Sequence, residues 1–77
     1  MEVKRAIELA NDRKRVWARV LISGGESVNV RCKRIAAVVW VVPDNGGAFW
    51  AADCIEEKTN ATYRVRVEDV LEEDRNG

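Results

Sequence analysis

The residues that could carry acid–base or nucleophilic chemistry are few in this sequence. It contains no histidine, the side chain used most often for general acid–base catalysis. Asp53 lies among apolar neighbours, where burial would raise the pKa of a carboxyl group and suit it to catalysis. The alternative is an Asp53 that accepts hydrogen bonds at a sheet edge or pairs with Arg64 or Arg66. Cys54 has no histidine to activate it as a nucleophile. We therefore assign no catalytic residue and expect a protein that is not an enzyme.

Two cysteines, Cys32 and Cys54, are the remaining candidates for covalent or metal chemistry. Without histidine, two thiols do not complete a tetrahedral zinc site, so we expect no metal and no cofactor. They could pair as a disulfide, but we favour two free, buried thiols. Residues 1–15 are charged throughout and have no apolar segment typical of a signal peptide, which predicts a cytoplasmic, reducing location.

Basic side chains and one tryptophan form a candidate nucleic-acid surface. Its members are Arg31, Lys33, Arg64, Arg66 and Trp17. The four cations would share one outward face if the strands that carry them approach each other, and the indole could stack on a base. The alternative is a solvated exterior on which Trp17 closes one end of the core. We keep nucleic acid as a partner that the sequence permits but does not favour.

Charge is divided along the chain although the net charge is zero. Residues 1–34 hold nine Lys/Arg against four Asp/Glu, a net of +5, and residues 35–77 hold four against nine, a net of −5. A protein that binds a polyanion is usually basic overall. The division permits a local basic face, complementary contacts between subunits, or a mixed solvated surface.

The element that must position these candidates is the uncharged run at residues 35–42, Ile-Ala-Ala-Val-Val-Trp-Val-Val. It is too short to span a membrane, which takes about 20 helical residues, and we expect no membrane partner. Its β-branched residues favour a strand. Both alternating faces are apolar, so the strand should be covered on two sides.

A turn signal, Asp-Asn-Gly-Gly at residues 44–47, follows this run and predicts a hairpin with residues 48–57. The natural register places Trp40 opposite Trp50, and a one-residue slip would pair Trp40 with Phe49 instead. The natural register also places Val38 opposite Ala52, and Ala36 opposite Cys54.

The N-terminal segment is ambiguous between a strand and a helix. As a strand, Val3, Ile7 and Leu9 face inward, and residues 11–12 (Asn-Asp) turn the chain into a second strand at residues 15–22. As a helix, the apolar stripe is Val3, Ile7, Ala10, Lys14, Trp17 and Leu21, broken by its lysine. We favour the β-hairpin and keep the helix as the alternative.

The rest of the chain alternates as further strands. Residues 27–34 lead, through a bend at residues 33–34, into the apolar run. At residues 62–68, Tyr63, Val65 and Val67 face inward, and residues 68–71 form a short helical turn that places Val70 or Leu71 against the core. Residues 72–77 are expected to be a frayed tail.

These elements predict one all-β domain over residues 1–77. It is a small antiparallel meander that closes into an SH3-like barrel or a curled sheet. The alternative is an α+β fold in which an N-terminal helix packs on a three- or four-stranded antiparallel sheet.

A small barrel has one interior, whereas residues 35–42 have two apolar faces. If the N-terminal segment leaves the second face bare, another subunit should cover it. The predicted self-association surface is Ile35, Ala37, Val39, Val41 and Phe49. The alternative is that residues 2–22 supply the cover within the chain.

The sequence resembles an SH3-like barrel in three places: the basic segment at residues 30–34, the strand with Trp40 and the closing pattern at residues 63–71. Within that class it resembles the plasmid-borne type II dihydrofolate reductases. Those proteins are tetrameric barrels of similar length whose pore is lined by Val-Gln-Ile-Tyr. Here the corresponding stretch, residues 65–68, reads Val-Arg-Val-Glu. The resemblance therefore implies a fold and self-association, and not that activity.

We expect, in sum, a small homo-oligomeric binding module whose ligand is a nucleic acid or a protein. The alternative function is an oligomeric enzyme with its site at a subunit junction.

Overall fold

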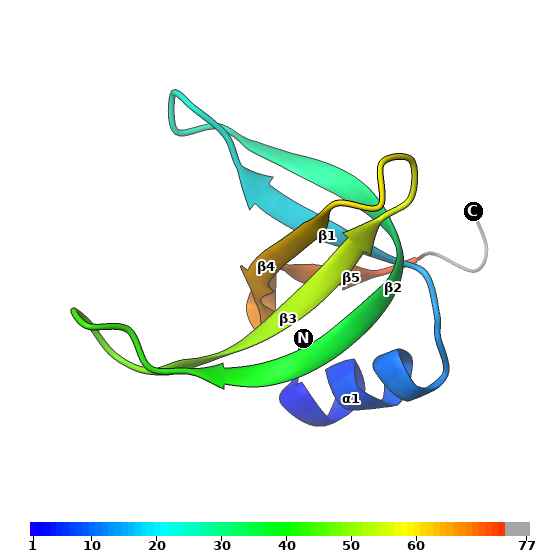
Figure 1. Ribbon diagram of the computed structural model, residues 1–77, viewed down its shortest axis with the longest axis horizontal. Helices are drawn as coiled ribbons and strands as arrows, with labels where there is room; N and C mark the ends of the chain where they lie inside the picture. Colours follow the sequence, from blue (N-terminus) through cyan, green and yellow to red (C-terminus); the bar gives the residue numbers. More distant parts are fainter. Residues whose placement is uncertain (74–77) are drawn as a thin grey trace.

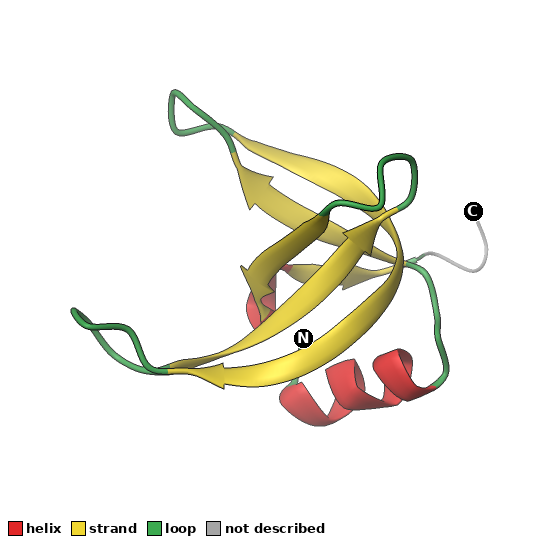
Figure 2. Cartoon of the chain, in the orientation of Figure 1, coloured by secondary structure: helices red, strands yellow, loops and turns green. Residues whose placement is uncertain are grey.

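One curled antiparallel sheet and one short helix make up the protein in the computed structural model, which describes residues 1–73 (Figures 1 and 2). In chain order the elements are α1 (Val3–Asn11), β1 (Val16–Leu21), β2 (Ser27–Val41), β3 (Phe49–Glu56), β4 (Thr62–Arg66), the 3₁₀ turn η1 (Val67–Asp69) and β5 (Val70–Glu72). The strands are hydrogen-bonded in the order β4-β3-β2-β1-β5, and every pair is antiparallel. The fold is therefore a mostly antiparallel, open sheet of five strands with one short N-terminal helix, which fits both the all-β class and the α+β alternative.

The long strand β2 belongs to two halves of the sheet. Its first half pairs with β1 up to Cys32, and its second half pairs with β3 from Cys32 to Val41. Two register shifts fall at the change-over, where Lys33 and Ala36 each add an extra residue on β2. Such bulges bend a strand and increase its twist. The bend predicted at residues 33–34 is confirmed, and it folds the sheet onto itself (Figure 1).

The predicted N-terminal hairpin is wrong, because Val3–Asn11 is a helix. The helix ends where Arg13 takes a left-handed φ of 54°. The amide of Arg13 donates to the carbonyl of Ala10, and that of Lys14 donates to the carbonyl of Leu9. This pair of bonds is the Schellman pattern that closes many helices. Alternation and local propensity left both a strand and a helix open for this segment, and the packing described next favours the helix.

Helix α1 packs against the second half of β2, on the side away from β3 (Figure 1). Its buried residues are Ala6 and Leu9, and Ala10 is half-buried. Ile7, which both sequence interpretations placed inside, is 43% exposed. The ion pair of Arg5 with Glu72, at 2.7 Å, ties the helix to β5. Part of the cover that residues 35–42 require thus comes from the chain itself.

The register of the central hairpin is confirmed at Trp40–Trp50 and Val38–Ala52. One pair differs from the prediction, because Ile35 and not Ala36 stands opposite Cys54. The bulge at Ala36 causes this change. As a result, Ile35 shares the core-facing side of the sheet with Val38, whereas Ala37, Val39 and Val41 lie on the other side.

The core between the two halves of the sheet is built from small side chains. Its buried members are Leu9, Val16, Ala18, Cys32, Ile35, Ala52, Cys54 and Val70. None of the five aromatic residues of the chain is among the buried residues of residues 1–73. A domain of this length with so little buried volume has a modest reserve of stability.

The C-terminal strand closes one side of the structure. The 3₁₀ turn confirms the short helical turn predicted after β4, one residue earlier than expected, and it places Val70 in the core. The predicted tail at residues 72–77 is corrected at its start, because Glu72 belongs to β5 and Glu73 pairs with Arg31. Residues 74–77 lie outside the described residues.

Candidate functional site

The largest exposed aromatic feature is the outer end of the β2–β3 hairpin. Strand β4 pairs with β3 only from Ala51 to Ile55, so the hairpin beyond Ala51 projects as a two-stranded ribbon (Figure 1). There the rings of Trp40 and Trp50 contact each other across the strands, with centroids 5.2 Å apart and ring planes tilted by 56°. Trp40 is 54% exposed, Trp50 is 39% exposed and Val42 is 71% exposed.

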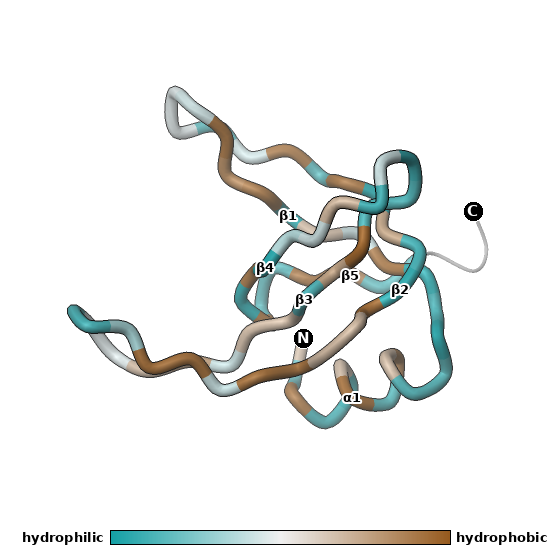
Figure 3. The backbone as a smooth tube through the Cα atoms, viewed as in Figure 1, coloured by the Kyte–Doolittle hydropathy of each residue, from teal (hydrophilic) through white to brown (hydrophobic). Residues whose placement is uncertain are grey.

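These three side chains extend the core-facing side of the sheet past the end of the core. Directly paired residues share a face, and Trp40–Trp50 stands two residues along from Val38–Ala52, whose side chains contact the core. Figure 3 shows hydrophobic segments running along this hairpin almost to its hydrophilic tip. The hairpin therefore offers water an apolar surface of the kind that cores and interfaces bury.

The opposite side of the hairpin carries most of the predicted self-association surface. Ala37, Val39, Val41 and Phe49 are half-buried there, and the guanidinium of Arg66 lies 3.9 Å from the ring centroid of Phe49. Ile35 is separated from them, because it is 1% exposed in the core. The structure thus brings together four of the five predicted residues, and it exposes the tryptophan side of the hairpin more than theirs.

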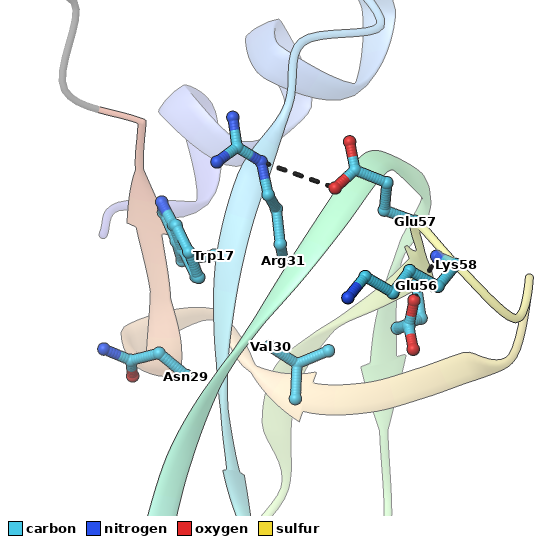
Figure 4. A pocket seen from close by; sticks show the side chains of 7 residues that line it. All are labelled: Trp17, Asn29, Val30, Arg31, Glu56, Glu57 and Lys58. Atoms are coloured by element: carbon cyan, nitrogen blue, oxygen red, sulfur yellow. Dashed lines mark hydrogen bonds and ion pairs between the residues drawn. The ribbon is translucent and has the colours of Figure 1, made fainter. Parts of the chain in front are cut away.

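Trp17 and Arg31, two members of the candidate nucleic-acid surface, line a hollow of about 360 Å³ (Figure 4). The other lining residues are Asn29, Val30, Glu56, Glu57 and Lys58. The guanidinium carbon of Arg31 lies 5.3 Å from the Trp17 ring centroid, a cation–π contact. The same guanidinium pairs with Glu57 at 3.5 Å and with Glu73. The hollow is therefore lined by charges of both signs, and its arginine is already engaged by two carboxylates.

Glu56, on the far side of this hollow, serves the turn that follows β3. Its carboxylate accepts hydrogen bonds from the amides of Lys58 and Thr59 and from the Thr59 hydroxyl. These bonds, led by that from the Lys58 amide, lower the pKa of Glu56 because they favour the charged form. Asn60, with a left-handed φ of 62°, completes the turn. We interpret Glu56 as a residue that shapes a loop.

The basic and acidic halves of the sequence form ion pairs with each other within the molecule. Among residues 1–73, five of the seven ion pairs join the basic half, residues 1–34, to the acidic half. They are Arg5–Glu72, Arg15–Glu57, Arg19–Asp69, Arg31–Glu57 and Arg31–Glu73. The two arginines that flank Trp17 in sequence thus both have carboxylate partners. Complementary contacts within one chain are an outcome that the sequence interpretation did not include.

Arg64 and Arg66 do not extend the surface around Arg31. They lie on β4, which β3 separates from β2, and each has a partner of its own. Arg64 binds Asp53 with two hydrogen bonds of 2.7 and 3.1 Å, and Arg66 covers Phe49. Lys33 is the extra residue of a bulge on β2 and is exposed. Of the five predicted residues, the structure thus brings Trp17 and Arg31 together and leaves the other three outside their hollow.

The candidates for catalysis are held in structural roles. The ion-pairing alternative for Asp53 is the one the structure shows, and this pair raises the pKa of Arg64 through its hydrogen bonds to the carboxylate. Cys32 and Cys54 are free and fully buried. Burial, followed by the neighbouring Cys32 thiol, raises the pKa of Cys54 to about 12, so its reactive thiolate form is suppressed.

Sequence reasoning missed Trp40, Trp50 and Val42 as exposed residues, because it assigned their face to a barrel interior. A signal was available in the sequence. The aromatic pair stands only four residues from the turn at residues 44–47, at the far end of a hairpin that the neighbouring strands of so short a chain do not reach. The acidic partners Glu57 and Glu73 were missed because they lie far from Arg31 in sequence.

Comparison with known proteins adds no relative: no family model, no curated protein and no solved structure matches the chain. Within residues 1–73, no helix has the length and apolar character needed to cross a membrane. The same residues contain no cluster of three or more His, Cys, Asp or Glu side chains placed to hold a metal ion.

Proposed function

We propose that this chain is a small binding module, not an enzyme, and that it contacts apolar protein surfaces through the outer end of its β2–β3 hairpin. For the fold, we propose a place among the small SH3-like barrels. The curled five-stranded sheet, its short connections and the approach of β1 to β4 support that assignment.

The observation that carries the proposed function is the composition of the projecting hairpin. Charged residues make up 34% of the chain, yet Asp44 in the turn is the only one between residues 35 and 52. The end of the same hairpin holds the exposed tryptophan pair. Centres of protein interfaces are depleted in charge and enriched in aromatic residues.

A protein surface suits this hairpin better than a nucleic acid does. Binding to a phosphate backbone depends on unpaired cations that replace counterions. The arginines beside Trp17 are neutralised by carboxylates, and no basic side chain stands between residues 35 and 52, where the exposed tryptophans lie.

Fluorescence of anilinonaphthalene sulfonate, a probe of accessible apolar surface, tests the proposed function on the folded protein. We expect enhanced emission with the parent protein and a loss of most of it in the double variant Trp40→Ser/Val42→Ser. The control is Leu21→Ser, since Leu21 is as exposed as Val42 but lies at the end of β1. Absence of enhancement, or an equal loss in the control, would overturn the proposal. So would a salt-sensitive mobility shift of a random-sequence oligonucleotide by the parent protein.

A further inference from the structure

The proposed function leaves the partner open, and the structure favours one. Resting on that function, we propose that the hairpin binds a second copy of this chain, hairpin against hairpin, about a two-fold axis. Trp40 and Trp50 would form the centre of the contact, with Val42 beside them.

The small size of the buried side chains is the first argument for a second copy. The buried hydrophobic residues include four alanines and two cysteines, and no aromatic side chain is buried in residues 1–73. Small domains of this kind commonly gain the burial that they lack by associating. A copy of the same chain is the partner that is present wherever the protein is made.

Charge is the second argument. The whole chain has a net charge of zero, so two copies approach without overall repulsion. In a two-fold contact the same patch of both copies forms the interface. A hairpin with several charges of one sign would therefore bring like charges together. The single charge between residues 35 and 52, Asp44, lies in the tip loop, beyond the tryptophan pair.

The exposed area sets the expected strength. The exposed parts of Trp40, Trp50 and Val42 amount to about 350 Å², if a tryptophan side chain contributes about 250 Å² when fully exposed. Two copies that bury only this side of the hairpin would bury about 700 Å² in total, which is the size of a weak, transient contact. We therefore expect a weak, reversible dimer with a dissociation constant on the order of 100 µM.

Sedimentation equilibrium of the full chain, from about 1 to 500 µM, tests this inference. The apparent mass should rise with concentration from 8.7 kDa towards twice that value. Val42→Lys should raise the dissociation constant at least about tenfold, because it places a cation at the contact. Leu21→Lys, at the same 71% exposure on the other hairpin, should leave the dissociation constant unchanged. Circular dichroism of both variants confirms that they fold.

Three results would overturn the second copy as partner. They are a parent protein that stays at the monomer mass throughout, a dimer indifferent to Val42→Lys, and equal losses in both lysine variants. A monomer that instead sediments with phosphatidylcholine vesicles would assign the hairpin to a lipid surface. The fluorescence experiment separates failure of the dimer from failure of the proposed function. If the protein stays monomeric but Trp40→Ser/Val42→Ser abolishes the enhanced emission, the apolar binding site is supported and only the second copy is excluded as its partner.

Discussion

Truncation of Leu9 tests the helix that the structure substitutes for the predicted N-terminal strand. Leu9 is 4% exposed and belongs to the core cluster, whereas Ile7, two residues earlier on α1, is 43% exposed. In a strand, Ile7 and Leu9 would point to the same side, and both were expected to face inward. In the helix they point about 160° apart, on nearly opposite sides, so only Leu9 reaches the core.

The magnitude follows from this burial. Leu→Ala substitutions in a core cost about 2–5 kcal/mol, and we expect about 3 kcal/mol for Leu9→Ala because it removes the only large buried side chain of α1. A core of this size supplies only about 3–5 kcal/mol, so the variant should be close to unfolding at room temperature. Ile7→Ala should change stability by less than about 0.5 kcal/mol, since alanine favours helix and little area is lost.

Urea unfolding, followed by circular dichroism at one low protein concentration, provides the assay. A fixed concentration matters because dimerisation would add to the apparent stability. Ile7→Gly adds a second control: in a helix it should cost about 1 kcal/mol more than Ile7→Ala. Similar losses for Leu9→Ala and Ile7→Ala would contradict the helix and restore the strand interpretation.

Two further predictions concern the turn and the thiols. Gly46 has a left-handed φ of 100°, whereas Gly47 has no such backbone conformation. Gly46→Ala should therefore lower the unfolding free energy by about 1 kcal/mol or more, while Gly47→Ala should be neutral or slightly stabilising. Equal urea midpoints of the two variants would refute this prediction. The raised pKa of Cys54 means that the folded chain holds this proton more tightly than the unfolded chain, so its stabilising contribution is complete below pH 9 and is lost as the pH rises towards 12. Above pH 9, the unfolding free energy of the parent should fall more steeply with pH than that of Cys54→Ala, and the two slopes should differ by up to about 1.4 kcal/mol per pH unit. Equal slopes would contradict the raised pKa of Cys54.

Local patterns in the sequence predicted much of the sheet. The turn at residues 44–47 predicted the hairpin and favoured the observed pairing of Trp40 with Trp50, although a one-residue slip also gave an aromatic pair. The alternation in β4 placed Tyr63 and Val65 correctly towards the core side. The helix failed because residues 2–9 satisfy both periodicities, and only packing against β2 decides between them. The ion pairs between the two halves of the chain could not be predicted, since they depend on which distant strands become neighbours.

Two inserted residues in β2 change which side chains enter the core without changing the side on which Trp40 lies. Strict alternation from Cys32 would turn Arg34 and Ala36 towards the core. A buried, unpaired guanidinium is costly, so a regular strand is unfavourable here. The bulge at Lys33 turns Arg34 outward beside Ile55, Ile35 then enters the core opposite Cys54, and the bulge at Ala36 restores the original alternation. Because the two insertions cancel, Val38 and Trp40 return to the core-facing side, and Trp40 remains exposed only because the core ends before it. The two bulges thus keep Arg34 out of the core and leave Trp40 on the side that a regular strand would give it.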